Sequence, residues 1–262
     1  MDRIAASRLA VVAPVLMLAS MGALGAIRSS GPSILIASSG RSTPAAPSSA
    51  GQVLFEEACS SCHGPGAQGT SAGPTLIGDG AAAVDWWIST GRMPLAAPLR
   101  QAARKPAAFT PDQRAAIVDY VTSLSPLGPP IPTVDTAHAS LQVGGDLFRT
   151  NCAACHGAAG IGGALAHGAY APSLRRATPL QVAEAIRIGP GNMPVFDERA
   201  LSNAQVNDIV SYVIYLRHPQ DRGGAGLGHL GPIAEGFVGL LFGVAGLMLV
   251  VYWIGDRTGA ET

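Results

Sequence analysis

The chain has 262 residues and carries 17 basic and 17 acidic side chains, so its formal net charge is zero. A balanced charge removes the electrostatic case for nucleic acid or a strongly acidic substrate as a partner. Only 13% of the residues are charged, the mean hydropathy is +0.29, and there are 33 Gly and 20 Pro. This composition favours a loop-rich protein with membrane segments over an ordinary cytosolic enzyme.

Residues 1–30 are predicted to form an N-terminal membrane anchor or signal segment. Arg3 and Arg8 precede an apolar run of 19 residues, Leu9 to Ile27, and such an order directs the following chain across the membrane. The run has about the length that spans a bilayer (~20 residues) and exceeds a usual signal core (~7–15 residues). Retained anchor and cleaved signal both stay open. Either one exports the chain that follows, which begins with a flexible spacer over residues 31–50.

The first predicted module, residues 51–125, opens with a helix that leads into Cys59-Ser60-Ser61-Cys62-His63. C-x-x-C-H is the attachment signature of a c-type haem. The two thiols add to the haem vinyl groups, and the histidine is placed to ligate the iron. A two-residue spacer lets one helical turn present both sulfurs to one edge of the macrocycle. Further helices are predicted over Ala81–Thr90 and after Thr110, the N-cap that precedes Pro111.

A proline-rich linker at residues 126–140 leads to a second predicted module at residues 141–218, which contains Cys152-Ala153-Ala154-Cys155-His156. All four cysteines of the chain lie in the two motifs. The modules form an internal repeat, with matching pairs that include Gly51 and Gly144, Phe55 and Phe148, Pro74 and Pro172, Gln113 and Gln205, and Tyr120 and Tyr212. The predicted fold class is therefore all-α, with two tandem small cytochrome c modules, each folded around a covalent haem.

The sixth iron ligand is predicted by counting methionines. Of six, only Met93 and Met193 belong to the modules, 30 residues after His63 and 37 residues after His156. Each precedes a proline, which favours an extended loop able to face the iron. His/Met ligation raises the reduction potential and leaves no iron position for a substrate. The alternatives are that both methionines only fill the core, or that one is replaced as ligand by His138, His167, His218 or His229.

Other polar residues of the modules have weaker assignments. Arg92, Arg175 and Arg176 are within the sequence neighbourhood of the haems and would reach propionates through charge-assisted bonds, but solvated positions explain them as well. Trp86 and Trp87 are expected to cover the first haem. The basic cluster in a stretch that the second module lacks is expected to be a solvated loop; its residues are Arg100, Arg104 and Lys105.

The C-terminal part of the chain is predicted to enter the membrane. Residues 219–232 are a glycine-rich linker, and residues 233–255 are predicted to be a transmembrane helix. Its last 20 residues carry no charge and end near Tyr252-Trp253, which is typical of an interfacial aromatic belt. Residues 256–262 are predicted to be a cytoplasmic tail, with both haem modules on the extracytoplasmic, periplasmic side of the cell membrane.

With two C-x-x-C-H-G modules, two Met-Pro loops and a C-terminal membrane helix, the chain resembles the dihaem cytochrome cc subunit of actinobacterial menaquinol–cytochrome c reductases, which are cytochrome bc complexes. The stretches 89–95 and 189–196 are particularly similar to that family. The resemblance assigns four residues to each haem: Cys59, Cys62, His63 and Met93 to the first, and Cys152, Cys155, His156 and Met193 to the second.

The resemblance also implies a function and partners. In that family the two haems relay electrons from the Rieske iron–sulfur protein to the copper centre of an aa-type cytochrome oxidase, and the complexes associate as a supercomplex. The implied partners are cytochrome b, the Rieske subunit, the oxidase and the lipid bilayer. The chain would then act as the electron-transfer subunit of an enzyme complex, with no catalytic pocket of its own.

Two alternatives remain at this stage. The dihaem subunit of a cbb-type oxidase is a similar relay, but it carries its anchor at the N-terminus, and the apolar segment at residues 233–255 argues against it. A dihaem peroxidase is an enzyme of another class. It needs one iron with an open or displaceable ligand, and Met93 and Met193 leave neither iron vacant.

Overall fold

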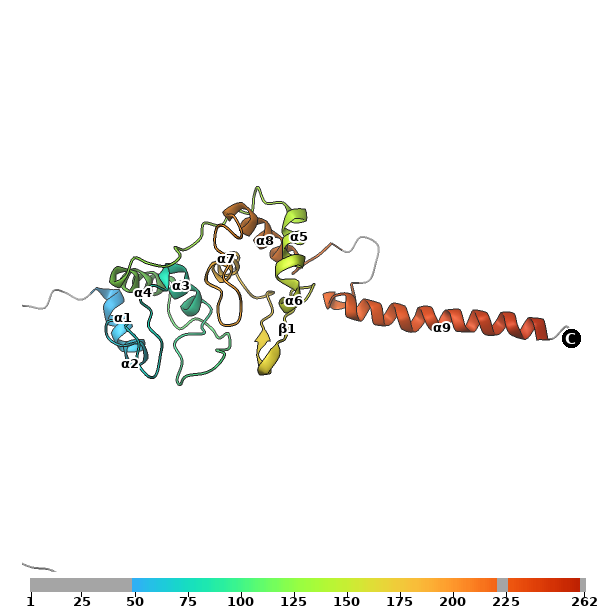
Figure 1. Ribbon diagram of the computed structural model, residues 1–262, viewed down its shortest axis with the longest axis horizontal. Coiled ribbons are helices and arrows are strands. Elements are labelled where there is room, and N and C mark those ends of the chain that lie inside the picture. The colour runs from blue at the N-terminus through green and yellow to red at the C-terminus, as the bar shows by residue number, and fades with distance from the viewer. Residues whose placement is uncertain (1–48, 221–225, 260–262) are drawn as a thin grey trace, which may run out of the picture. The chain divides into compact units, whose positions relative to one another are not determined.

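The computed structural model describes residues 49–220 and 226–259 (Figure 1). The predicted anchor or signal at residues 1–30 and almost all of the spacer at residues 31–50 lie outside the described residues. The described chain is mostly helical, and it contains two helical modules followed by one long apolar helix. The predicted all-α class is confirmed.

The two modules contain the same four helices in the same order. Those of the first module are α1 (Ala50–Ala58), α2 (Ser60–His63), α3 (Gly80–Ser89) and α4 (Pro111–Leu124). Those of the second are α5 (Leu141–Asn151), α6 (Ala153–His156), α7 (Pro179–Ile188) and α8 (Asn203–Tyr215). The second module adds an antiparallel hairpin that consists of β1 (Gly163–Ala164), the 3-10 turn η1 (Ala166–Gly168) and β2 (Tyr170–Ala171).

Local sequence rules account for the helix starts. Thr110 accepts a hydrogen bond from the Gln113 N–H, and the Gln113 side chain accepts one from the Thr110 N–H, so the predicted N-cap is a complete capping box. Pro111 takes the first helical position, where a missing N–H costs nothing. Reciprocal boxes of the same kind begin α7 and α8.

The first helix of each module crosses the last helix at a glycine. A Cβ at Gly51 would lie 1.9 Å from the Ala116 carbonyl oxygen, and a Cβ at Gly144 would lie 2.0 Å from that of Asp208. Only glycine allows the backbones of α1 and α4, or of α5 and α8, to approach so closely. The repeated glycines therefore fix the crossing on which each module is built.

An aromatic pair beside each crossing closes the core. Phe55 packs on Tyr120 with ring centroids 5.4 Å apart, and Phe148 packs on Tyr212 at 5.5 Å. Both phenylalanines are completely buried. Each stands four residues before the first cysteine of its motif, so the buried ring anchors the helix that delivers the cysteine.

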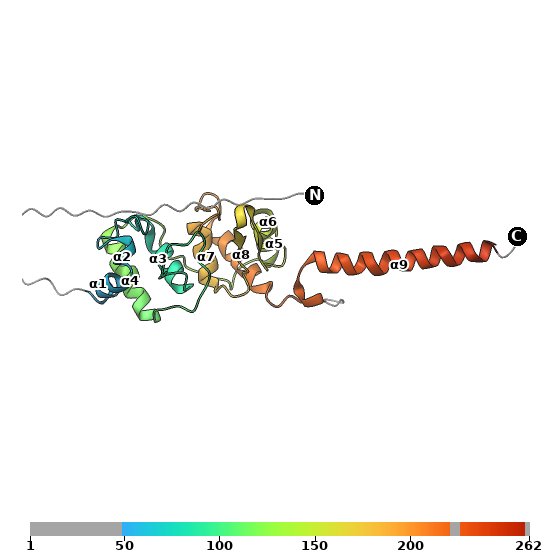
Figure 2. The same ribbon diagram turned by 90° about the horizontal axis from the view of Figure 1, so that it is seen from below.

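The modules pack against each other through α3 and α7, which hold the same place in the repeat (Figure 1, Figure 2). The Trp86 indole N–H donates to the Gln181 carbonyl oxygen at 3.0 Å. Trp86 is thus buried and bonded to the second module, so the expectation that it covers the first haem is not supported. The linker is attached at both ends: Ala82 N–H donates to Pro129 O, and Asp135 N–H donates to Asn207 Oδ1.

The long apolar helix α9 (Pro232–Gly259) follows a 3-10 turn, η2 (Leu227–His229). Its segment Pro232–Asp256 has 25 residues, a mean hydropathy of 2.4 and no buried part, so by length and composition it is able to cross a membrane. The helix continues beyond residue 255 into the first residues of the predicted tail. The chain is a membrane-anchored protein with a C-terminal apolar helix.

Candidate haem sites

Each C-x-x-C-H motif lies at a kink between two helices. Cys59 ends α1 and begins α2 with φ −125° and ψ −36°, and Cys152 joins α5 to α6 with φ −120° and ψ −37°. His63 N–H donates to Cys59 O at 2.9 Å, and His156 N–H donates to Cys152 O at the same distance. One short helical turn therefore carries both thiols and the histidine, as the spacing predicts.

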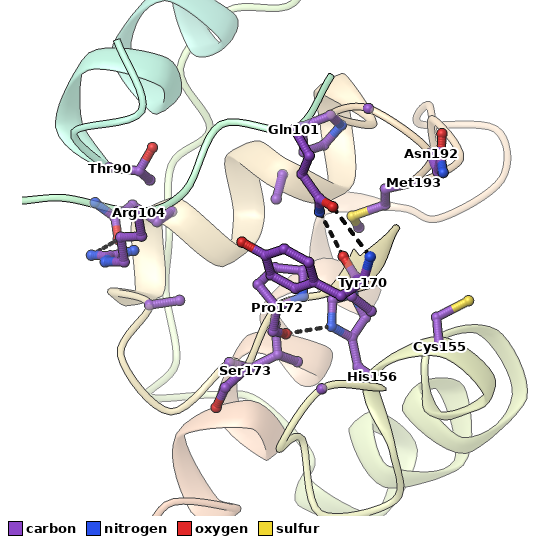
Figure 3. Close-up of a pocket in the computed structure, with 18 of the residues that line it drawn as sticks. Thr90, Gln101, Arg104, Cys155, His156, Tyr170, Pro172, Ser173, Asn192 and Met193 are labelled. Carbon is purple, nitrogen blue, oxygen red and sulfur yellow. Dashed lines mark hydrogen bonds between the residues drawn. The ribbon is translucent and has the colours of Figure 1, made fainter. Parts of the chain in front are cut away.

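Both histidines are oriented by a proline carbonyl. The Nδ1–H of His63 donates to Pro74 O at 2.7 Å, and that of His156 donates to Pro172 O at 3.0 Å (Figure 3). A carbonyl only accepts, so this bond places the proton on Nδ1 and leaves Nε2 with a free lone pair. A histidine that ligates a metal is held in this way. The repeated prolines were visible in the sequence, but the role of their carbonyls was not.

The two methionines pack on the same cores as the cysteines of their modules. Met93 and Cys59 contact the first core, around Phe55, and Met193 and Cys152 contact the second, around Phe148. Figure 3 shows Met193 and His156 pointing into the same space from different elements. The donor set of each module, two thiols, an imidazole and a thioether, is that of a His/Met c-type haem.

The second set lines a cavity of about 800 Å³ that both modules build (Figure 3). Its walls include Cys152, Cys155, His156 and Met193 from the second module, and Trp86 and Arg104 from the first. The volume is within the range of cofactor pockets, about 300–1,000 Å³, so the residues fit a haem. Among the described residues that line it are Met93 and Met193, but none of His138, His167, His218 and His229. Met193 packs on the same core as Cys152, whereas Met93 packs on the core of the first module, so Met193 is the candidate second ligand beside His156.

The Met193 loop is held by a buried arginine that the sequence analysis missed. Arg187, at the end of α7 and only 8% exposed, donates Nη1–H to Phe196 O at 2.9 Å and to Leu201 O at 2.7 Å. Its Nη2–H donates to Asn203 Oδ1 at 2.7 Å. These bonds join both ends of the segment after Met193 to one guanidinium. Charge-assisted bonds of this kind are stronger than neutral ones, so they stabilise the conformation of the loop.

The Met93 loop is held differently and contacts the second module. Lys105 donates Nζ–H to Pro94 O at 3.1 Å. The Gln101 amide donates to Tyr170 O at 2.6 Å and accepts from Tyr170 N–H at 3.2 Å, while Arg104 donates to Gln181 Oε1 at 2.8 Å (Figure 3). The expected solvated basic loop is therefore wrong for Arg104. The segment lies against the second module and closes one side of its cavity.

The remaining arginines separate into two groups. Arg92 and Arg176 line the second cavity, as an assignment to propionates requires. Arg175 instead donates Nη2–H to His229 O at 2.6 Å, in the turn before α9.

Trp87 also lines the second cavity, so the expectation that it covers the first haem is not supported.

Burial shifts the pKa of several groups at these sites. Burial first, and the neighbouring cysteine second, raise the pKa of the Cys59 and Cys152 thiols to about 11. Both sulfurs therefore lie in an apolar environment that disfavours a charged thiolate. Burial also lowers the pKa of His156, while its bond to Pro172 opposes the shift. The lowered pKa favours the neutral ring, which is the form that ligates a metal.

Family models for cytochrome c domains match both modules. A model described as cytochrome c matches residues 48–125, and one described as cytochrome C oxidase, cbb3-type, subunit III matches residues 139–213. Together with the two repeated donor sets, these matches define the class. The chain is a c-type cytochrome with two covalently bound haem c groups.

Curated relatives narrow the class. The chain is 42% identical over 216 residues to the cytochrome bc1 complex cytochrome c subunit of Mycobacterium leprae, covering 79% of this chain and 74% of the relative. It is 36% identical over 226 residues to that of Corynebacterium diphtheriae, with 79% and 80% covered. A cbb3-type cytochrome c oxidase subunit CcoP of Azospirillum sp. is 31% identical over 185 residues, with 62% and 60% covered. The chain therefore belongs to the family of cytochrome bc1 complex cytochrome c subunits, and its function is electron transfer.

Proposed function

We propose that this chain relays electrons from the Rieske iron–sulfur protein of a quinol–cytochrome c reductase to the copper centre of an aa-type cytochrome c oxidase. Haem c supplies a one-electron iron couple when bound. The observation that carries the proposal is the pair of His/Met donor sets on one repeated frame. Such a chain has two electron-carrying stations instead of one, so it has room for an input and an output.

Each residue of the donor sets has a proposed role. Cys59 and Cys62 attach the first haem, and Cys152 and Cys155 attach the second. His63 and His156 would ligate the irons, and the carbonyls of Pro74 and Pro172 support this by leaving Nε2 free. Met93 and Met193 would supply the second protein ligand of each iron. Neither iron would then have a site for a substrate, so catalysis would belong to the complex and not to this chain alone.

The membrane helix supports a fixed position within such a complex. We place the haem modules on the extracytoplasmic side and the C-terminal tail in the cytoplasm, with cytochrome b and the Rieske subunit as neighbours. The apolar length of Pro232–Asp256 supports a single crossing. A haem relay tethered beside its donor and acceptor meets them without long-range diffusion, and the zero net charge of the chain agrees with this.

The dihaem subunit of a cbb-type oxidase is the second candidate, because the second module matches a model of that family over residues 139–213. The share of each relative's length that the match covers favours the reductase. Matches to bc1 subunits span 74% and 80% of the relatives, whereas the match to the cbb3-type subunit spans 60%. The C-terminal helix α9 also favours the reductase.

The test is to purify the protein from its native membranes in mild detergent and to record the reduced-minus-oxidised spectrum of what accompanies it. Haem b and haem a bands beside those of haem c are the expected result. Haem b and c without haem a would leave the reductase alone or the cbb-type alternative. Haem c alone would contradict the proposal and favour a membrane-anchored carrier or a peroxidase.

A further inference from the structure

The cavity that contains His156 and Met193 has a strongly one-sided charge. Among the described residues that line it, four are arginines and none is Asp or Glu. Arg92 and Arg104 come from the first module, and Arg176 comes from the second. No acidic side chain of the described chain forms an ion pair with any of these three. A cavity with this lining attracts an anion.

Arg92 shows the imbalance most clearly. Its side chain is only 8% exposed, its guanidinium lies 4.5 Å from the centroid of the Trp86 ring, and its Nη1 has no hydrogen-bond partner among the described residues. A buried donor without an acceptor costs about 1–3 kcal/mol, and more when charged. Arg92, Arg104 and Arg176 line the same cavity, and the positive charge of Arg104 acts on Arg92 as that of Arg176 acts on Arg104. An anion in the cavity would therefore stabilise this group of three arginines.

The position of the cluster indicates which anion it binds. In haem c the two thioether bonds lie toward one edge of the macrocycle and the two propionates extend from the opposite edge. Figure 3 shows Cys155 on one side of His156 and Met193, and Arg104 on the other side. A macrocycle attached at Cys152 and Cys155 would therefore direct its propionates toward Arg104. The planar guanidinium group matches a carboxylate in charge and geometry.

We propose that Arg92, Arg104 and Arg176 bind the propionate carboxylates of the second haem, so that the first module completes the haem site of the second. Attachment of the second haem then also holds the modules together, through Arg104 and its bond to Gln181. Positive charge close to a haem disfavours the extra positive charge of the ferric iron, so the cluster raises the reduction potential of the second haem. The inference depends on the second haem being bound and not on the route of the electrons.

The test is a potentiometric titration of both haems in the detergent-purified holoprotein, with the variants Arg104→Gln and Arg176→Gln. The control is Arg199→Gln, which removes an exposed arginine of the second module outside the cavity. Met93→His and Met193→His assign the two potentials, because loss of a methionine ligand lowers the potential of its own haem. Each cavity variant is expected to raise the ratio of ferric to ferrous second haem at a given applied potential by about threefold to tenfold. A tenfold change in this ratio equals a shift of about 59 mV in the potential of a one-electron couple.

One further variant and one further condition complete the test. Arg104→Lys keeps the positive charge but lacks the planar guanidinium, so it is expected to shift the potential of the second haem less than Arg104→Gln does. It also provides a test if the Arg104→Gln protein does not accumulate. Added phosphate is expected to leave the wild-type potentials unchanged, because propionates already occupy the cluster. A shift of the first haem instead of the second, equal potentials in the cavity variants and wild type, or a second-haem potential that follows phosphate would each overturn the proposal.

Discussion

In the first module Pro74 follows His63 by 11 residues, whereas in the second Pro172 follows His156 by 16, and the hairpin β1–β2 lies in that interval. After the methionine, the first module has the longer interval. Gln113 follows Met93 by 20 residues, whereas Gln205 follows Met193 by 12. The extra segment of the first module contains Gln101, and the hairpin of the second contains its partner Tyr170.

The repeated and the unrepeated parts of the modules therefore have different tasks. The shared positions, such as Gly51 and Gly144, build the frame that carries a haem. The two insertions contact each other and join the frames. The two repeated modules are thus joined by a longer loop that lies at a different place in each copy. The experiments below change either the shared frame or the unshared segments.

The largest expected effect comes from Gly51→Ala and Gly144→Ala, which alter the same position of the shared frame. The added Cβ would lie 1.9 or 2.0 Å from a carbonyl oxygen of the crossing helix, so the helices must separate. Each variant is expected to lose the haem of its module or to fail to accumulate, as measured by haem c per chain. Gly66→Ala is the control, because its Cβ would meet only the flexible end of Gln68. Full haem content in both crossing variants would refute the shared frame.

The second largest effect is expected where the modules hold their methionine loops differently. Arg187→Ala removes three bonds from a buried guanidinium and is expected to lower the free energy of unfolding by about 3–5 kcal/mol. It should also weaken the near-infrared absorption of the Met-ligated ferric second haem. Lys105→Ala removes one exposed bond in the other loop and should cost less than about 1 kcal/mol. Equal losses of unfolding free energy in the two variants would show that the two loops are stabilised to the same extent.

A pH-dependent effect is expected at the α3–α7 contact. Glu184 of α7 is completely buried and faces Asp85 of α3 and Arg114 of α4. Burial first, and Asp85 second, raise its pKa to about 9, and Arg114 opposes the shift. The folded protein therefore keeps a proton that the unfolded chain releases above its ordinary pKa of 4.5. Stability should fall as pH rises through this window, by on the order of 1 kcal/mol per pH unit at most, and level off above pH 9.

Glu184→Gln tests this assignment because the amide has a similar shape and does not titrate. The free energy of unfolding of the wild-type and variant holoproteins is compared by denaturant unfolding between pH 5 and pH 9. This range covers about 4 pH units below the raised pKa. The variant should gain stability relative to wild type as pH rises. Parallel curves for the two proteins would mean that Glu184 does not carry the proton.

The smallest expected effect concerns the contact between the two insertions. Gln101→Ala removes both bonds to Tyr170 and should lower the stability of the hairpin by about 1 kcal/mol. Hydrogen exchange of the Tyr170 amide measures this opening, and both haem contents should stay unchanged. A Tyr170 amide that exchanges equally fast in the variant and the wild type would show that the insertions touch without stabilising each other.

The sequence predicted those features that local rules determine. The paired motifs, the Thr110 cap and the helices around each haem follow from residue type and spacing within a few positions. Pairing residues across the repeat also identified Pro74 and Pro172, although only the structure shows that their carbonyls orient the histidines.

The parts that the sequence did not predict are contacts between segments without a repeat. Gln101 and Tyr170 are 69 positions apart, and Arg104 and Gln181 are 77 apart. An unmatched basic stretch has no partner position in the other module, so solvation was its simplest explanation. Arg187 was missed for a related reason, since an arginine near a helix end usually lies at the surface. Its burial depends on how the Met193 loop folds back, which no local rule gives.

The most direct test of the two-haem unit is the rate of electron exchange between the haems of the detergent-purified protein. One electron per chain is introduced by flash photoreduction, and the relaxation between the two haems is followed by absorbance over a range of protein concentrations. A single joined unit predicts a relaxation rate that does not depend on concentration, because both haems belong to one chain whose modules are in contact. A rate that rises in proportion to concentration would mean that electrons pass between molecules, and would contradict a relay within this chain.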